Sequence, residues 1–170
     1  MTAILITGNP GSGKTSLASE LARRGCAVID ADDIAGWETT SGVPVTQPVP
    51  ASDEWLLSHR WVWSRSRVDA VITERSSPGR PLFVCGIAVN QREMLDLFDH
   101  VFLLTLDHET QVERLNAPSN AHRTVALRAQ ILDGRPVFEA QMLAARAIAL
   151  DGRLPVSLLA SQILDEVASR

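Results

Sequence analysis

Short runs of hydrophobic residues alternate along the chain with stretches in which hydrophobic residues recur every three or four positions. The short runs have the length and β-branched content of buried strands, and the periodic stretches have the spacing of amphipathic helices. Strands are predicted over residues 3–7, 26–29, 82–85, 101–106 and 147–150. Helices are predicted over residues 16–24, 34–37, 52–74, 90–98, 109–115, 125–132 and 137–146, with a last helix from Pro155. This alternation predicts an α/β fold with a parallel sheet and helices on both faces.

Three segments interrupt the alternation. Residues 38–51 are rich in Pro, Thr and Val, and we interpret them as a mobile loop that serves as a substrate flap. Residues 134–136 read Gly-Arg-Pro and are predicted to separate two helices. Residues 116–122 form a polar, helix-breaking insert between Arg114 and Arg123, and an arginine-bearing loop of this kind is a candidate lid.

Residues 8–15 read GNPGSGKT, which is the G-x-x-x-x-G-K-T pattern of a phosphate-binding P-loop, between the first predicted strand and the first predicted helix. The glycines let the backbone bend closely around a phosphate, and the loop N–H groups and the positive helix end face the anion. Lys14 is expected to reach the β- and γ-phosphates, and the Thr15 hydroxyl to ligate Mg²⁺. The predicted nucleotide-binding residues here are Gly8, Asn9, Pro10, Gly11, Ser12, Gly13, Lys14, Thr15 and Ser16.

Lys14 is the only lysine among the 16 basic residues of the chain, and all the others are arginines. A general preference for arginine is typical of coding bias. A lysine at the P-loop nevertheless has a physical reason, since it is a flexible point charge that the planar arginine fork does not replace there. The composition therefore supports a working phosphate-binding loop.

Acidic residues follow the second predicted strand, at Asp30, Asp32 and Asp33. In open α/β sheets ligands bind beyond the carboxyl ends of the strands, so this cluster is expected to face the P-loop. A functional role is predicted for at least one of Asp30 and Asp32, and the alternative of capping the next helix is assigned to Asp33. Asp107 could ligate a metal, but capping the helix of residues 109–115 is the preferred interpretation.

The four tryptophans all lie between residues 37 and 63, and the chain has no tyrosine. On the helix predicted over residues 52–74, Arg60, Trp63 and Arg67 fall on one face. Clustered Trp and Arg side chains suit a flat or anionic ligand, whereas ordinary packing of the indoles and solvated arginines are an equally weighted alternative. The candidate acceptor-binding residues are Asp32, Trp37, Arg60, Trp63, Arg67 and Gly86.

Composition narrows the class of protein. With 170 residues, 45% of them hydrophobic, the chain has the size of one folded domain, and its net charge of −4 argues against a nucleic-acid-binding protein. The hydrophobic runs are too short for a membrane span, and a strand from residue 3 leaves no room for a signal peptide. Cys26 and Cys85 are interpreted as reduced cysteines of a cytoplasmic protein. A monomer or homodimer is expected.

These motifs together resemble the small P-loop kinases, the group of shikimate kinase, gluconate kinase and adenylate kinase, over nearly the whole chain. The resemblance implies a three-layer P-loop NTPase sandwich whose five-stranded parallel sheet has the order 2-3-1-4-5. Asp30-Ala31-Asp32 resembles the D-x-D of shikimate kinases, which implies that Asp30 supports Mg²⁺ and that Asp32 contacts the substrate hydroxyl. Gly86 resembles a glycine that approaches the substrate.

The resemblance also implies further nucleotide contacts. Arg114 resembles the arginine that stacks on adenine before the lid, Arg123 resembles a lid arginine, and Asp151, Gly152 and Arg153 resemble an adenine-contacting loop. Residues 87–89, by contrast, read Ile-Ala-Val and depart both from the AMP-binding run of adenylate kinases and from the glycine triplet of shikimate kinases. A kinase class is therefore implied without a named substrate.

The sequence thus predicts a single domain over residues 1–170, with a substrate-binding insert at about 31–80 and a short lid at about 114–124. The expected activity is transfer of the γ-phosphoryl group of ATP, with Mg²⁺, to a hydroxyl or phosphate oxygen of a small molecule, with Lys14, Asp32 and Arg123 as catalytic residues. The alternatives are a nucleoside monophosphate kinase, a slow ATPase, and a non-catalytic ATP-binding module that regulates a partner.

Overall fold

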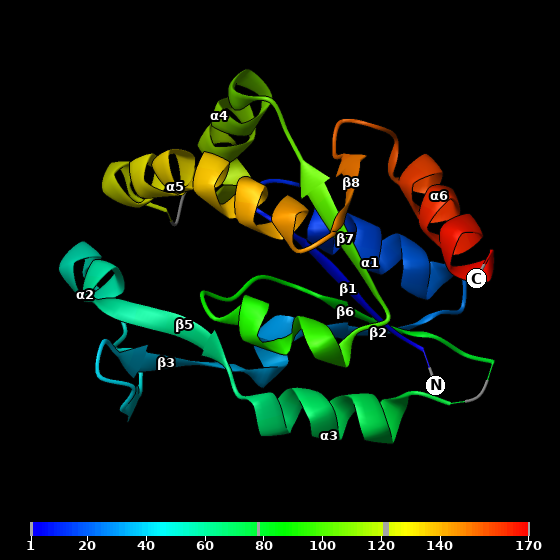
Figure 1. Cartoon of the computed structure of the whole chain (residues 1–170). Helices are drawn as coiled ribbons and strands as arrows, with labels where there is room; N and C mark the ends of the chain where they lie inside the picture. The colour runs from blue at the N-terminus through cyan, green and yellow to red at the C-terminus, as the bar shows by residue number, and fades with distance from the viewer. Residues whose placement is uncertain (1, 78, 121–122, 170) are drawn as a thin grey trace.

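A five-stranded parallel sheet runs through the middle of the molecule (Figure 1). The computed structural model describes residues 2–77, 79–120 and 123–169. The strands of this sheet are β1 (Ala3–Gly8), β2 (Ala27–Asp30), β6 (Leu82–Cys85), β7 (His100–Thr105) and β8 (Ile148–Asp151). Their order across the sheet is β2-β6-β1-β7-β8, which is 2-3-1-4-5 when these five strands are counted along the chain. The predicted fold class and strand order are confirmed.

The central strands β1 and β6 are buried along their whole length, so hydrophobic side chains point from both faces of the sheet. On one face, α1 (Lys14–Arg23) and α6 (Val156–Ala168) bury Leu17, Leu21 and Ile163 against β1, β6 and β7. On the other face, Val68 of α3 (Arg65–Arg75) and Met94 of the 3₁₀ segment η2 (Gln91–Leu97) pack on the sheet. The result is the expected three-layer arrangement, although η2 is a 3₁₀ segment where an α-helix was predicted over residues 90–98.

The predicted helix over residues 52–74 is wrong. The segment forms α2 (Asp53–Ser58), β5 (His59–Trp63) and α3, which begins after Ser64. Residues 59–63 read His-Arg-Trp-Val-Trp, and such bulky aromatic and β-branched side chains favour a pleated surface once a partner strand is available. Arg60 and Trp63 therefore lie on a strand and Arg67 on a helix, so the predicted face shared by these three residues does not exist.

The partner strand is β3 (Ala35–Thr39), where the short helix over residues 34–37 was predicted. With β4 (Pro44–Val45) it forms a second, antiparallel sheet of order β4-β3-β5, so the segment interpreted as a mobile loop is partly strand. The link from β2 to this sheet is the 3₁₀ segment η1 (Ala31–Ile34). Its N-cap is Asp30, whose carboxylate accepts the Asp32 N–H at 3.0 Å, so the predicted capping role of Asp33 is also wrong.

After β7 the chain forms α4 (His108–Asn116), the 3₁₀ segment η3 (Pro118–Asn120) and α5 (Val125–Ala144). Figure 1 shows α4 above the end of β7 and α5 beside it. Asp107 caps α4 as predicted, since its carboxylate accepts the Thr110 N–H at 2.8 Å. The predicted break at Pro136 does not occur, because α5 continues through the proline. The missing backbone hydrogen bond is offset by burial of Met142, with Phe138 packed beside it, against Leu103 of β7.

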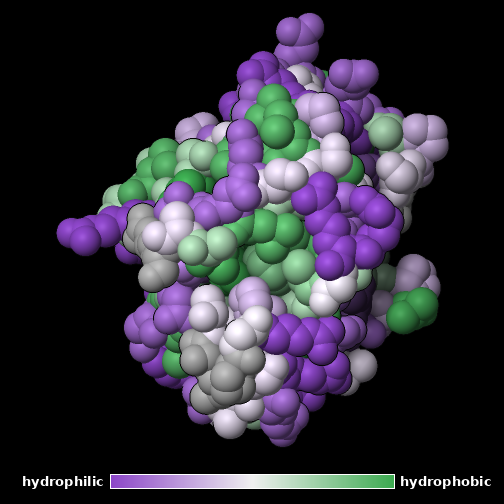
Figure 2. Space-filling view, turned by 90° about the vertical axis from the view of Figure 1, so that its right-hand side faces the viewer, coloured by the Kyte–Doolittle hydropathy of each residue, from purple (hydrophilic) through white to green (hydrophobic). Residues whose placement is uncertain are grey.

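The side of the molecule that carries the chain ends is mostly hydrophilic, with hydrophobic side chains gathered in a hollow near its centre (Figure 2). A cavity of about 450 Å³ is lined by Thr2, residues 79–81 and the end of α6. It shares no lining residue with the larger cavity at the P-loop. No helix in the described part of the chain is both long enough and apolar enough to cross a lipid bilayer.

Candidate active site

The P-loop connects the end of β1 to the start of α1. Two positions of the loop require glycine for conformational or steric reasons. A Cβ on Gly8 would lie 2.6 Å from the carbonyl oxygen of Leu104, so the loop leaves β1 through a space that admits no side chain. Gly13 is the N-cap of α1 and has a φ of 99°, a left-handed conformation that glycine adopts without strain. The loop is therefore bent as phosphate binding requires, with the positive end of α1 facing the cavity.

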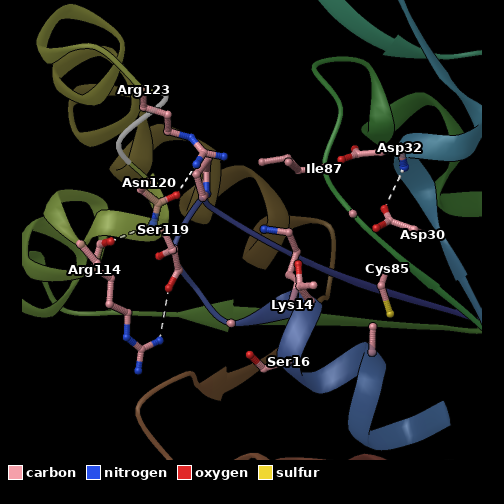
Figure 3. A pocket seen from close by; sticks show the side chains of 17 residues that line it. Lys14, Ser16, Asp30, Asp32, Cys85, Ile87, Arg114, Ser119, Asn120 and Arg123 are labelled. Carbon is pink, nitrogen blue, oxygen red and sulfur yellow. Dashed lines mark hydrogen bonds between the residues drawn. The ribbon is translucent and has the colours of Figure 1, made fainter.

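A cavity of about 680 Å³ opens at the carboxyl ends of β1, β2 and β6, beside the P-loop (Figure 3). Its size suits a nucleotide or another small molecule. Its lining residues are Pro10, Gly11, Gly13, Lys14, Thr15, Ser16, Ala18, Asp30, Asp32, Cys85, Gly86, Ile87, Arg114, Ala117, Ser119, Asn120 and Arg123. The P-loop, the acidic pair after β2 and the two arginines that flank the candidate lid thus meet in one place.

Lys14 folds back onto the loop that precedes it. Its Nζ donates hydrogen bonds to the carbonyl oxygens of Gly8 at 2.7 Å and Asn9 at 3.1 Å. Burial lowers the pKa of Lys14 from 10.5 to about 8, and the nearby Asp32 carboxylate partly opposes that effect. At pH 7 most of the Lys14 side chains are therefore protonated and able to meet an anionic phosphate.

Asp30 and Asp32 line the same cavity from the end of β2 and the start of η1. Burial, followed by repulsion from Asp30, raises the pKa of the Asp32 carboxyl, while a side-chain hydrogen bond from Trp61 and the charge of Lys14 work in the opposite direction. A carboxylate with a raised pKa is a better proton acceptor, which is the property that a general base needs.

Arg114 ties three parts of the nucleotide side together. Its guanidinium donates to the carbonyl oxygens of Gly11 at 3.2 Å and Gly152 at 3.0 Å, so α4, the P-loop and the segment after β8 are linked by one side chain. Gly152 lies close to the P-loop, since a Cβ there would be 2.8 Å from the Ser12 carbonyl oxygen. The structure therefore brings Arg114 and Gly152 to the P-loop.

Arg153 is engaged outside the cavity. It pairs with Asp151 at 2.7 Å and with Asp107 at 2.9 Å, and the hydrogen bonds from Arg153 lower the pKa of Asp151 to about 2. Asp107, Asp151 and Arg153 are absent from the described lining of the cavity. Since Asp30 lines the cavity together with Thr15 and Asp107 does not, Asp30 is the better placed candidate to support a metal beside Thr15.

Arg123 and Asp32 point into the cavity from opposite sides (Figure 3). Arg123 donates to the Asn120 side chain, and Asn120 in turn donates to the backbone oxygen of Arg114 at 2.8 Å. Burial lowers the pKa of Arg123, and the charge of Asp32 opposes that shift. The candidate lid is thus anchored to α4, although its residues 121 and 122 lie outside the described part of the chain.

Most of the predicted acceptor-binding side chains are not in the cavity lining that the described residues form. Trp37, Arg60, Trp63 and Arg67 are missing from it. Arg60 pairs with Glu38 of the neighbouring strand at 3.2 Å, and Arg67 is exposed on α3. The sequence placed the two arginines on one helix face toward an anion, whereas Arg60 lies on β5 and Arg67 on α3.

Gly86 does line the cavity, and its lack of a side chain also has a packing reason. A Cβ at this position would lie 2.4 Å from the Cβ of Ala31 and 3.5 Å from Cζ2 of Trp63. Trp63 is therefore buried beneath the cavity floor, and its backbone is held by Asn90 through two hydrogen bonds of 2.9 Å. Close packing between β6 and η1 requires glycine here whether or not a ligand approaches it.

Sequence reasoning missed several lining residues, among them Cys85, Ile87, Ser119 and Asn120. Cys85 could have been found, because it is the last residue of a predicted strand whose carboxyl end faces the P-loop. Burial raises its pKa to about 12, so its thiol stays protonated. Ser119 and Asn120 lay inside the predicted lid, but nothing in their spacing marked them individually.

The donor set fits Mg²⁺ that arrives with a nucleotide. In the described part of the chain, no three His, Cys, Asp or Glu side chains gather closely enough to hold a metal ion by themselves. Magnesium in such sites takes one or two protein oxygens and completes its shell with phosphate and water. The Thr15 hydroxyl and the Asp30 carboxylate, which both line the cavity, supply oxygens of this kind.

Solved structures of three kinases share the fold over nearly the whole chain. Shikimate kinase from Acinetobacter baumannii in complex with shikimate is 23% identical, with a TM-score of 0.64 and coverage of 99% of this chain and 94% of its own. A gluconokinase from Sinorhizobium meliloti 1021 is 18% identical, with a TM-score of 0.54 and coverage of 99% and 92%. Deoxyadenosine kinase from M. mycoides with bound dATP is 11% identical, with a TM-score of 0.57 and coverage of 98% and 100%.

The sequence comparisons give a family. No curated protein sequence matches the chain. The sequence pattern of the AAA domain family AAA_18 matches residues 4–133, a range that runs from β1 through the P-loop and the acidic pair into α5. The chain therefore belongs to the AAA domain family, and its fold is that of the small P-loop kinases.

Proposed function

We propose that the protein is a small-molecule kinase that uses ATP and Mg²⁺ to phosphorylate a hydroxyl or phosphate oxygen of its acceptor. The observation that carries this proposal is the meeting of Lys14, Asp32 and Arg123 in one cavity. A phosphate-binding lysine, a carboxylate with a raised pKa and a second cation are the groups that phosphoryl transfer to a hydroxyl needs. A module that only bound ATP would have no use for the carboxylate.

The nucleotide side of the cavity is built for the triphosphate. Backbone N–H groups of the P-loop would bind the phosphates, and Lys14 would exchange its bonds to Gly8 and Asn9 for the β- and γ-phosphate oxygens. Arg114 lies beside the loop, where it would meet the adenine or its ribose. Thr15 and Asp30 would hold Mg²⁺, which when bound neutralises charge on the phosphate oxygens.

On the acceptor side, Asp32 would accept the proton of the attacking hydroxyl. The acceptor oxygen forms its bond to the γ-phosphorus as the bond between that phosphorus and the β–γ bridging oxygen breaks, and ADP leaves. Lys14 and Arg123 would stabilise the charge on the transferring group from two directions. A phosphate acceptor would already be ionised, and Asp32 would then only orient it.

Candidate acceptors follow from the kinases that share the fold. Their names point to shikimate, gluconate and deoxyadenosine, which differ in charge and shape.

The decisive test is ADP release from ATP and Mg²⁺ in the presence of each compound. A thermal-shift screen with ADP comes first, because a ligand of the native state raises Tm. Release that depends on one acceptor supports the proposal. Equal release with and without every acceptor indicates an ATPase, and tight ATP binding without release indicates a regulatory module.

Asp32→Asn and Asp33→Asn form a matched pair for the mechanism. Both substitutions remove one carboxylate from η1, but only Asp32 lines the cavity. We expect Asp32→Asn to lower kcat by at least about a hundredfold with the KM for ATP unchanged, since general-base catalysis contributes about 10²–10⁴-fold. Asp33→Asn should leave kcat within twofold of the parent on the same order-of-magnitude reasoning. Transfer by Asp32→Asn at the parent rate would remove Asp32 from the mechanism.

A further inference from the structure

The side chain of Gln91 is buried at the junction of three elements. It lies at the start of η2 with 1% of its surface exposed, and the residues that it contacts are also buried. Its Oε1 accepts the Thr7 hydroxyl at 3.0 Å and the Ala88 N–H at 3.3 Å. Its Nε2 donates to the Met142 sulfur at 3.4 Å. One amide therefore joins the end of β1, the segment after β6 and α5.

The backbone fixes the orientation of this amide. A backbone N–H can only donate, so the atom that faces the Ala88 N–H is the side-chain oxygen of Gln91 and not its nitrogen. Glutamine is rarely buried, and its burial costs free energy unless its polar atoms are hydrogen-bonded. A methionine or leucine would fill the same space without that cost. The groups that Gln91 joins therefore explain why a glutamine is found at this position.

The first of these groups is the segment that follows β6, which we name the Ile87 segment (residues 86–89). Its Gly86 N–H donates to the Ile6 backbone oxygen at 3.0 Å, and its Ala88 N–H donates to the buried amide. Ile87 lies between these two anchored residues. The backbone on both sides of Ile87 is thus held in place.

Ile87 occupies a part of the cavity that an acceptor would reach. It lines the cavity together with Gly86. Figure 3 shows its side chain between those of Arg123 and Asp32, which line the same cavity. These are the two groups proposed to act on the transferring phosphoryl group and on the acceptor. The position of Ile87 therefore limits how an acceptor can lie between them.

The second group is the strand that leads into the P-loop. Thr7 directly precedes Gly8, the first residue of that loop, and its hydroxyl donates to Gln91. Transfer requires the acceptor oxygen and the γ-phosphorus to approach to about 3–3.5 Å. The P-loop determines where the phosphate lies, and the Ile87 segment borders the place of the acceptor. A side chain bonded to both sides therefore influences their relative position.

We propose that Gln91 is a positioning residue that holds the Ile87 segment at a fixed distance from the P-loop and so aligns the acceptor with the γ-phosphate. This inference rests on the proposed kinase function, because it needs an acceptor that reacts in the cavity. Gln91 is absent from the described lining of the cavity, so it acts through the segment that it holds. Its bond to Met142 extends the junction to α5, the helix that follows the candidate lid.

The contact with the Ile87 segment can be tested without any acceptor. Gln91→Met keeps the approximate size of the side chain and removes the oxygen that accepts the Ala88 N–H. We expect the Ala88 amide to exchange with solvent about fivefold faster in Gln91→Met, because a hydrogen bond contributes roughly that factor to a local opening equilibrium. Residue-resolved hydrogen exchange by NMR measures this rate.

The Gly86 amide of the same segment is the internal reference, because it donates to the Ile6 backbone oxygen and not to Gln91. Its exchange rate should change by less than about twofold, since its own hydrogen bond is retained. Equal acceleration of the Gly86 and Ala88 amides would indicate a general loss of stability, and an unchanged Ala88 rate would show that the contact is absent. Either result would overturn the proposal.

The positioning role is tested by kinetics at the other end of the junction. Thr7→Val keeps the shape of the side chain and removes the hydroxyl that donates to Gln91, whereas Thr7→Ser keeps that hydroxyl. We expect Thr7→Val to lower kcat about tenfold or more with the KM for ATP unchanged, since a displacement of about 1 Å can cost roughly a hundredfold in rate. Thr7→Ser should keep most of the parent kcat.

Thr105→Val is the matched control. Thr105 ends β7, on the other side of β1 from β6, and its hydroxyl donates to the Leu150 backbone oxygen at 3.2 Å. The substitution therefore removes one threonine hydrogen bond from the same sheet without touching the Gln91 junction. Thr105→Val should keep the kcat of the parent.

The assay is ADP release from ATP and Mg²⁺ with shikimate, gluconate or deoxyadenosine as the acceptor. In a parent protein that phosphorylates one of them, equal kcat values for Thr7→Val and Thr105→Val would overturn the positioning role. Failure of the kinase proposal gives a different result, namely no acceptor-dependent ADP release by the parent, and the role of Gln91 in transfer falls with it. The two failures are therefore distinguishable in one series of measurements.

Discussion

The Lys14 ammonium donates to the carbonyl oxygen of Gly8 at 2.7 Å, so the lysine of the P-loop is held by the first residue of its own loop. The contact keeps the side chain folded over the position that a phosphate would take. It also compensates for the burial that lowers the pKa of Lys14 to about 8, since carbonyl oxygens replace part of the lost water. Substrate binding would then exchange one set of oxygens for another.

Lys14→Ala should reduce phosphoryl transfer by at least about a hundredfold, because it removes one charge contact to the transferring group. Lys14→Arg should not restore the rate, since a planar fork cannot follow the path that the flexible stem takes to Gly8 and Asn9. Both variants should keep the circular dichroism spectrum of the parent. Measured ADP release by Lys14→Ala at the parent rate would contradict the mechanism.

Asp30→Asn and Asp107→Asn separate the two candidate metal carboxylates. We expect Asp30→Asn to raise the Mg²⁺ concentration needed for half-maximal ADP release, because its carboxylate shares the cavity with Thr15. Asp107→Asn should leave that concentration unchanged and lower the urea midpoint, since Asp107 caps α4 and pairs with Arg153. The opposite pattern, with Mg²⁺ dependence altered only in Asp107→Asn, would move the metal to the end of β7.

The P-loop side of the site could be predicted because its signals are local. Strand, loop and helix follow one another within the first 24 residues, and the carboxyl ends of parallel strands must share one edge of the sheet. The acceptor side could not be predicted in the same way. The pairing of Trp37 with Trp61 joins residues far apart in sequence, and residues 59–63 have a spacing that fits a helix equally well until β3 is present.

Gly86→Ala tests whether this glycine serves packing or substrate approach. The new methyl group would lie 2.4 Å from the Cβ of Ala31, so we expect a loss of about 1–3 kcal/mol in the free energy of unfolding. The double variant Ala31→Gly/Gly86→Ala should regain part of that loss, because it removes the atom that clashes. Equilibrium urea unfolding measures both effects.

The same double variant also reports on the acceptor. If its stability returns but acceptor-dependent ADP release does not, the Gly86 position must stay open for the substrate as well. Parent-like stability of the single Gly86→Ala variant would contradict the packing argument.

Glu20 should make the stability of the fold depend on pH in the acid range. Hydrogen bonds from Arg23 and Arg24 lower the pKa of Glu20 from 4.5 to about 2. A carboxyl group whose pKa is lower in the folded state stabilises that state above its unfolded pKa, and the contribution is lost as the pH falls through the folded pKa. The stabilisation by Glu20 should therefore be complete above about pH 5 and should fade between pH 4.5 and 2.

The contact between Glu20 and Arg24 matters because it orients the Arg24 guanidinium. Arg24 donates to the Ser157 backbone oxygen at 2.7 Å and to the Ser161 hydroxyl at 2.9 Å, and so joins α1 to α6. Glu20→Gln should lower the urea midpoint at pH 7, and the difference from the parent should shrink as the pH falls toward 2. Glu113→Gln on α4 controls for the loss of one negative charge. A difference between Glu20→Gln and the parent that stayed constant down to pH 2 would show that the Glu20 carboxylate does not carry this link. The helix that begins at Lys14 would then owe its position on α6 to hydrophobic packing alone.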